Sequence, residues 1–387
     1  MRHYEQAILF TPGPTNVPFR VLAAGSKPLL HHRSDEFSMI LKDVIRKMKE
    51  VFETSQDVLI VHTTGRGAME GAIINALSPG DEILCVCNGK FGEMFADIGE
   101  VNGLKVKRMF TDWLEPVDPS LIEENLKHNK DIKAVTITHC DTSTAVINPI
   151  KEIGEIVRKY NRLFIVDCIS SLGCMEFKFD DWKVDIAITA SQKGLMAPTG
   201  ISFVAINQRA WDAVEKSKFR NYYIDFKDIK DKLYNGWETP GSTPISLVVS
   251  VNESLDMIFE EGLKNVYKRH FAISRAIKKS LPLIGFELFP ETVVERSPSV
   301  TALKVPDGLT SSQIIDMAMG KYGILIASGL GKYKNSVIRI GHMGSISIRE
   351  AVLLITILEN IMYELGRIDC MGKALMSFCD NIKEYFG

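Results

Sequence analysis

The stretch VDIAITASQKGLMAPTG, residues 184–200, places a single lysine directly after an apolar run. Residues 186–188 are typical of a buried strand, and Lys193 lies between Gln192 and Gly194 just past its end. An unpaired ammonium is unfavourable at such a position. A partly desolvated lysine, however, loses its proton more easily and can attack a carbonyl carbon to form a Schiff base. The alternative is a lysine in a surface loop.

Strand-like and helical segments alternate on both sides of this stretch. The short apolar segments are at residues 57–63, 81–87, 104–110, 132–140, 162–168, 185–191 and 201–207. Helical periodicity is found at residues 67–77, 91–103, 119–128 and 148–160. The alternation predicts an α/β fold whose large domain has a mostly parallel sheet sandwiched by helices. Ligands bind at the carboxyl ends of the strands in such sheets.

Two helix starts carry a more specific expectation. Ser34 precedes two acidic residues and an apolar stripe that follows helical spacing to residue 52, so it is predicted to cap that helix. Asn148, which is followed by Pro149, is predicted to cap the helix of residues 148–160.

The pattern changes after about residue 245. Two long helical stretches, near residues 245–281 and 347–367, flank short strands at VTALKVP, ILIAS and VIRIG. These predict a smaller α+β domain. We therefore expect an N-terminal segment at residues 1–16, containing the rigid TPGP, a large domain at 17–262 and a small C-terminal domain at 263–387.

Composition excludes several classes of protein. The formal charge of −2 gives no reason to expect nucleic acid or an anionic membrane as a partner. The chain shows no signal peptide and no membrane-spanning apolar run, so a soluble, cytoplasmic protein is expected. The seven cysteines form no CxxC pair and favour reduced, buried thiols. No metal site is expected, because the histidines lack zinc-ligand spacing.

Three polar loops follow predicted strands. TTGRG, residues 63–67, offers backbone amides and the start of a helix to an anion, although a plain tight turn fits it equally. Asp167 ends RLFIVDC, where it can accept a hydrogen bond from a heterocyclic N–H or cap the next turn. HCDTST, residues 139–144, carries hydroxyls that can reach a phenolic oxygen or shape a turn.

These loops occur in an order that fits one cofactor. Pyridoxal 5′-phosphate needs a helix end for its phosphate, a stacking face, an acid for its pyridine nitrogen and an amine for its aldehyde. Phe91, in NGKFG, supplies an aromatic ring at a further strand end, where ordinary core packing is the alternative. The sequence therefore predicts a pyridoxal phosphate site built around Lys193.

Taken together, VDCISSLG, SQKG and the late RIG resemble the class V aminotransferases of fold-type I, closest to the alanine–glyoxylate and serine–pyruvate aminotransferases. The similarity extends from TPGPTN to RIGHMG. It implies transfer of an amino group from a small amino acid to a small 2-oxo acid by ping-pong chemistry. It also implies that Lys193 forms the internal aldimine and that Asp167 pairs with the pyridinium nitrogen.

The resemblance assigns further contacts to the cofactor and the substrate. By that resemblance, cofactor contacts fall to Gly65 and Arg66 in the phosphate loop, Phe91 at the ring face, Thr142 near the phenolic oxygen and Gln192 at the phosphate. Substrate contacts fall to Gly13 and to Arg339, which matches the arginine that binds the α-carboxylate; a structural salt bridge is the alternative for Arg339.

The family is similar in being homodimeric, with active sites at the subunit interface. The segment matching ETPGSTP reaches the partner's phosphate in the family, and either Ser242 or Thr243 fits that contact. The basic cluster His31, His32 and Arg33 is a departure from close relatives. We hypothesise that Arg33 binds a second anionic group of a phosphonate, phosphate or dicarboxylate substrate; a solvated or dimer-contact cluster is the alternative.

Phe91 stands in place of the tryptophan often found there, which keeps the stacking face but loses an N–H donor.

Two rival interpretations of the function remain. A cysteine desulfurase or related lyase on the same fold needs a reactive thiol before the carboxylate-binding arginine, and ASGLGKYKNSVIRIG contains no cysteine. A non-enzymatic binding module conflicts with the intact set of acid, lysine and arginine.

Overall fold

The computed structural model describes residues 7–290 and 296–386. Its strands are β1 (Ile8–Phe10), β2 (Asp57–Val61), β3 (Glu82–Cys87), β4 (Lys105–Phe110), β5 (Ile132–Thr138), β6 (Cys140–Asp141), β7 (Val146–Ile147), β8 (Leu163–Asp167), β9 (Ile186–Ala190), β10 (Ser202–Ile206), β11 (Glu287–Phe289), β12 (Val300–Lys304), β13 (Ile324–Ser328) and β14 (Val337–Gly341). Its helices are α1 (Phe19–Gly25), α2 (Asp35–Phe52), α3 (Gly65–Ala76), α4 (Lys90–Val101), α5 (Pro119–His128), α6 (Ile150–Lys159), α7 (Gln208–Val214), α8 (Phe226–Gly236), α9 (Ile245–Glu261), α10 (Leu263–Ser280), α11 (Ser311–Tyr322), α12 (Ile348–Glu364) and α13 (Lys373–Phe386), with short 3₁₀ helices η1 (Leu281–Ile284) and η2 (Gly331–Tyr333).

A seven-stranded sheet, in the order β2-β10-β9-β8-β5-β3-β4, forms the centre of the larger lobe. Only β10 runs against its neighbours, so β2, β3, β4, β5, β8 and β9 all point the same way. Apart from the edge strand β4, in which Lys105, Lys107 and Phe110 are exposed, the strands are buried on both faces, which explains why they are continuous apolar runs rather than alternating ones. The predicted mostly parallel α/β sheet is confirmed.

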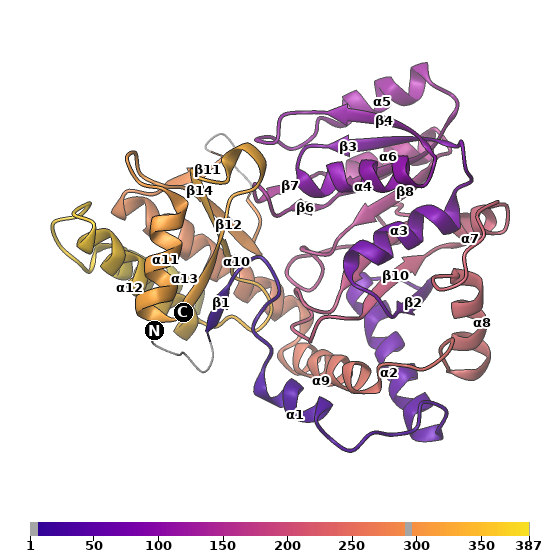
Figure 1. Ribbon diagram of the computed structural model, residues 1–387, viewed down its shortest axis with the longest axis horizontal. Helices are drawn as coiled ribbons and strands as arrows, with labels where there is room; N and C mark the ends of the chain where they lie inside the picture. Colours follow the sequence, from indigo (N-terminus) through magenta and orange to yellow (C-terminus); the bar gives the residue numbers. More distant parts are fainter. Residues whose placement is uncertain (1–6, 291–295, 387) are drawn as a thin grey trace.

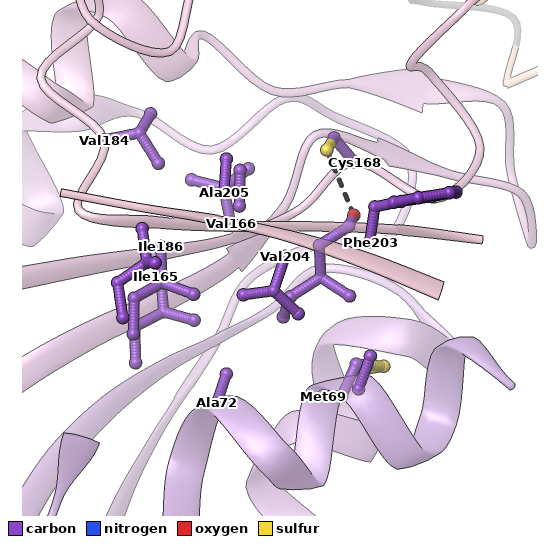
Figure 2. Close-up of a cluster of buried hydrophobic side chains, with 14 of the residues drawn as sticks. Met69, Ala72, Ile165, Val166, Cys168, Val184, Ile186, Phe203, Val204 and Ala205 are labelled. Atoms are coloured by element: carbon purple, nitrogen blue, oxygen red, sulfur yellow. Dashed lines mark hydrogen bonds between the residues drawn. The ribbon is translucent and has the colours of Figure 1, made fainter. Parts of the chain in front are cut away.

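Helices cover both faces of this sheet (Figure 1). α3 and α4 contact each other on one face, whereas α5 and α6 contact each other on the opposite face, as right-handed crossovers require. Figure 2 shows Met69 and Ala72 of α3 below Val204 of β10, with Ile165 and Ile186 side by side in the sheet. This packing fixes the strand ends from which the polar loops emerge.

The smaller lobe is built on a second sheet, in the order β1-β13-β14-β12-β11 (Figure 1). Helices α10 to α13 pack on it around a separate apolar cluster that includes Phe10. β1 pairs in parallel with β13, with Ile8 opposite Ile324. The predicted N-terminal segment therefore contributes a strand to this sheet before it crosses to the larger lobe, and its residues 1–6 lie outside the described residues.

The first long helical stretch is two helices rather than one. α9 ends at Glu261 and α10 starts at Leu263, because Gly262 has a positive φ of 85° that a helix cannot contain. The predicted division into residues 1–16, 17–262 and 263–387 stays a prediction. Among the described residues, none of the helices combines the length and apolar content needed to cross a bilayer.

One of the two predicted helix caps is wrong. The Ser34 hydroxyl accepts a hydrogen bond from the Phe37 amide at 3.3 Å, as expected. Asn148 does not cap α6: its side chain donates to the Thr138 carbonyl at 2.8 Å and accepts from the Val117 amide at 3.0 Å. The hydrogen bonds of a buried amide that joins three chain segments are stronger than those of a cap at an exposed helix end, because no water competes for them.

Two helical glycines give a matched test of the packing. At Gly154 in α6, an added methyl group would collide with the backbone carbonyl of Trp182, whereas at Gly320 in α11 no atom lies within 4 Å of it. Gly154→Ala is expected to lower the free energy of unfolding by about 1–3 kcal/mol, and Gly320→Ala to raise it by about 0.5–1 kcal/mol. Urea unfolding measures both, and equal effects would contradict the packing of α6 on residue 182.

Candidate active site

Five polar loops meet at one edge of the large sheet. They follow the carboxyl ends of β2, β3, β5, β8 and β9, which are parallel and therefore end on the same side. These loops contain Gly65, Phe91, Thr142, Asp167 and Lys193. Five residues spread over 129 positions of sequence thus meet because of the sheet order alone.

Lys193 lies under the N-terminal segment. Its Nζ donates a hydrogen bond to the carbonyl of Pro12, and a side chain on Gly13 would collide with it. The segment is held there by the Thr15 amide, which donates to the Gln192 carbonyl at 3.1 Å. Burial lowers the pKa of Lys193 to about 8, with Asp167 acting to raise it and Arg339 to lower it.

Asp167 is buried at the end of β8. Its Oδ1 accepts a hydrogen bond from the Ile169 amide at 2.8 Å, so one oxygen does shape the following turn. Burial raises the pKa of Asp167 to about 7, and the positive charge of Lys193 acts in the opposite direction. The carboxylate and the amine influence each other's pKa without forming a direct ion pair.

The hairpin formed by β6 and β7, residues 140–147, connects the aromatic loop to the lysine. Asp141 is fully buried, and its Oδ2 accepts from the Phe91 amide at 3.0 Å. Its Oδ1 accepts from the Ser143 amide at 2.9 Å. Sequence interpretation placed Asp141 within a hydroxyl cluster but gave it no role, because a local pattern does not show that a side chain reaches a loop fifty residues away.

Arg339 on β14 faces the same hairpin from the smaller lobe. Its Nη1 donates to the Thr142 carbonyl at 3.0 Å and its Nε to the Ser328 carbonyl at 2.7 Å. Burial lowers the pKa of Arg339 to about 10. Within the described residues the guanidinium has carbonyl partners and no carboxylate partner, so the structural salt bridge considered for it is not found.

The Gly65–Arg66 loop begins α3 with free amides. The Thr64 side chain makes no capping hydrogen bond, so the amides of the first turn are available to an anion. Gly65 packs against Ile169, the residue that also holds Asp167, whereas Arg66 is exposed. The Oε1 of Gln192 is buried without a hydrogen-bond partner. The free amides of the helix end fit an anionic group, whereas the Gln192 oxygen can only accept a hydrogen bond.

The other predicted residues, Ser242, Thr243 and Arg33, make their contacts away from Lys193. The Thr243 hydroxyl is buried and hydrogen bonded to Thr239, whereas Ser242 is exposed in a cleft of about 640 Å³. Arg33 forms an ion pair with Glu238 of the same ETPGSTP segment, not with the residues around Lys193. Pro12, Ser328 and Glu238 were missed by sequence interpretation; the first two act through backbone carbonyls, which no residue type reveals.

The comparisons with known proteins agree with this geometry. The family described as Aminotransferase class-V matches residues 7–345. The chain is 37% identical to an uncharacterised aminotransferase of Methanocaldococcus jannaschii (93% of each chain covered) and 35% identical to the L-aspartate–glyoxylate aminotransferase of Paracoccus denitrificans (94% of this chain and 92% of the relative). It superposes on the crystal structure of ureidoglycine–glyoxylate aminotransferase from Bacillus subtilis with a TM-score of 0.93, at 28% identity, covering 98% of this chain and 99% of that one.

The family model matches most of the chain, and both relatives are above 30% identity over nearly its whole length. The chain belongs to the class V aminotransferases.

Proposed function

We propose that the protein is a pyridoxal 5′-phosphate-dependent transaminase that moves the amino group of a small amino acid, of the alanine or serine type, to a small 2-oxo acid such as glyoxylate or pyruvate by ping-pong chemistry. The observation that carries the proposal is the buried guanidinium of Arg339, which lacks a carboxylate partner and lies within electrostatic range of Lys193. The names of the Paracoccus and Bacillus relatives, which both contain glyoxylate, support the acceptor.

The residues around Lys193 fit the cofactor. When bound, pyridoxal phosphate supplies an aldehyde that takes up the amino group and a ring that withdraws electrons. Lys193 offers the amine, Asp167 a partner for the ring N–H, and Phe91 a stacking face. The uncapped start of α3 suits the phosphate.

Lys193 is the residue that moves the proton. Because burial lowers its pKa to about 8, a far larger fraction of the amine is neutral near physiological pH than for an ordinary lysine with a pKa of 10.5, and the neutral form can take a proton from the substrate Cα. Arg339 holds the substrate carboxylate on the opposite side, which directs the Cα–H bond toward that amine. The Pro12 carbonyl accepts a hydrogen bond from Nζ and so limits where the amine can lie.

Two copies of the chain complete the proposed site. Ser242 is our choice for the residue that reaches the phosphate of a partner subunit, because its hydroxyl is exposed while that of Thr243 is bonded to Thr239. The ion pair between Arg33 and Glu238 joins the basic cluster to the same segment, which supports a position near the partner's substrate. We also propose a cytoplasmic location.

A desulfurase interpretation lacks a suitable thiol. Cys140 and Cys174 are close enough to Lys193 to influence its pKa, but burial raises their own pKa values to about 11 and 12. Cys140 also donates to the Ser297 hydroxyl at 3.1 Å. Both therefore stay protonated thiols, which are poor nucleophiles.

A matrix of amino donors and 2-oxo acceptors tests the proposed reaction. The cofactor-loaded protein is expected to use alanine or serine with glyoxylate or pyruvate. The variant Arg339→Lys is expected to have a kcat/KM about tenfold to a hundredfold lower, because it loses a bidentate carboxylate contact. Arg349→Lys is the matched control, because that side chain is 90% exposed. Equal activity of the two variants would contradict the role of Arg339.

The protonation of Lys193 can be measured without cofactor. Competitive acetylation followed by peptide mass spectrometry is expected to give a midpoint near pH 8 for Lys193, below the ordinary value of 10.5. Because the Asp167 carboxylate raises this pKa, Asp167→Asn is expected to move the midpoint to lower pH. Asp181→Asn, at an exposed position, serves as the control. A wild-type midpoint near 10.5 would rule out a buried amine.

Arg33 decides whether an anionic donor is accepted. Arg33→Ala is expected to lower kcat/KM for aspartate about fivefold, the equivalent of one exposed ion pair, while leaving alanine within twofold. Lys27→Ala, an exposed cation in the segment between α1 and α2, is the control. If both donors keep their rates in Arg33→Ala, the cluster has no part in substrate choice.

A further inference from the structure

The loop of residues 329–336, which joins β13 to β14, borders the carboxylate-binding arginine at both ends. Ser328 precedes the loop and Arg339 follows it, and the Ser328 carbonyl accepts from Arg339 Nε at 2.7 Å. Ala327 and Ser328 of β13 pair with Arg339 and Ile338 of β14, so the loop joins the two strand ends that hold the guanidinium. The loop contains Gly329 and Gly331, whose backbones have wide conformational freedom, so its own sequence does not make it rigid.

The far end of the loop is anchored within the smaller lobe. The Ser311 hydroxyl donates to the Lys334 carbonyl at 2.7 Å, and the Val305 amide donates to the Ser336 carbonyl at 2.9 Å. Residues 330–333 form the outer turn, which includes the short helix η2, and they are not held by these bonds. The turn lies instead against the larger lobe.

That contact is aromatic. The ring of Tyr333 lies 4.7 Å from that of Phe289 in the smaller lobe and 6.5 Å from that of Trp113 in the larger lobe, centroid to centroid. A methyl group added to Gly331 would lie 3.4 Å from the Trp113 ring. Tyr333 also packs on an apolar cluster shared by the two lobes, which contains Cys140 and Phe289. The outer turn of the loop is therefore held against Trp113.

Trp113 is itself fixed to the active-site edge of the large sheet. The Asp112 side chain accepts from the Leu114 amide at 3.1 Å and shapes the turn that carries the ring. The Asn88 side chain, three positions before Phe91, donates to the Glu115 carbonyl at 3.3 Å. The Asn88 side chain also donates to Asn148, the residue that ties strand β5 to this turn. Trp113 is thus held by the strand ends that form the site.

We propose that Trp113 is a positioning residue for the substrate carboxylate: through Tyr333 it holds the loop that joins the strand ends carrying Ser328 and Arg339. This inference rests on the proposed function, because it presupposes that Arg339 binds a carboxylate. Trp113 touches neither substrate nor cofactor in this account. It sets the position of the arginine relative to Thr142, whose carbonyl lies on the other lobe.

The test compares Trp113→Ala with Trp113→Phe and Phe110→Ala. Phe110 is the last residue of β4, three positions before Trp113, and is 66% exposed, so its removal controls for loss of an aromatic ring nearby. Glycolate, a carboxylate that cannot be transaminated, is titrated into the cofactor-loaded protein by absorbance. Trp113→Ala is expected to raise its Kd about tenfold, the size of one aromatic pair, and to raise KM for alanine with kcat within twofold.

Two further readouts separate positioning from general stability. Trp113→Phe is expected to restore most of the glycolate affinity, and Phe110→Ala to leave it unchanged. Hydrogen exchange of the cofactor-free protein is expected to accelerate in residues 329–336 of Trp113→Ala and to stay unchanged in residues 140–147. Equal glycolate affinity in wild type, Trp113→Ala and Phe110→Ala would overturn the inference. A Trp113→Ala variant that has a lower kcat and loses its cofactor, but keeps the wild-type KM, would also overturn it.

A variant that fails to fold does not end the test. Tyr333→Leu removes the other ring of the contact and is measured in the same way; wild-type Kd and loop exchange in it would also overturn the inference. A wild-type protein that neither binds glycolate nor transaminates would refute the proposed function itself. If the wild type binds glycolate and transaminates, and the Trp113 and Tyr333 variants have the same glycolate Kd and KM, only the role of Trp113 is refuted.

Discussion

The structure depends on keeping the amine of Lys193 buried opposite a carboxylate that it does not touch. Burial alone would make an ammonium costly, and a direct ion pair with Asp167 would relieve that cost but close the space between them. The protein uses a single carbonyl acceptor, from Pro12, instead. The result is an amine with a pKa of about 8 facing an acid with a pKa of about 7, each shifted by burial.

The 140–147 hairpin converts this local arrangement into a site that spans both lobes. Asp141 holds the backbone of Phe91 on one side, and the Thr142 carbonyl accepts from Arg339 on the other. The Ser297 amide donates to the Ala145 carbonyl at 3.1 Å and docks the smaller sheet onto the same hairpin. Groups that would recognise a ring and a carboxylate are therefore set at fixed distance by one short element.

Much of this could be predicted from the sequence, because the signals are local. The continuous apolar strands gave the parallel sheet, and a parallel sheet brings the residues after each strand, such as Asp167 and Lys193, to one edge. What could not be predicted depends on contacts between distant segments. Asn148 looks like a helix cap in sequence yet bridges three segments, and the acceptors at Pro12 and Ser328 are backbone atoms, which carry no residue signal.

The most direct measurement is the position of the covalent link to the cofactor. The loaded protein is reduced with borohydride, digested, and its peptides are mapped by mass spectrometry. A reduced cofactor adduct on Lys193, and its absence from the protein carrying Lys193→Ala, is the result that this account predicts. An adduct on Lys278, a half-buried lysine whose pKa is lowered by burial to about 7 and which donates to the Ser274 hydroxyl, would contradict it.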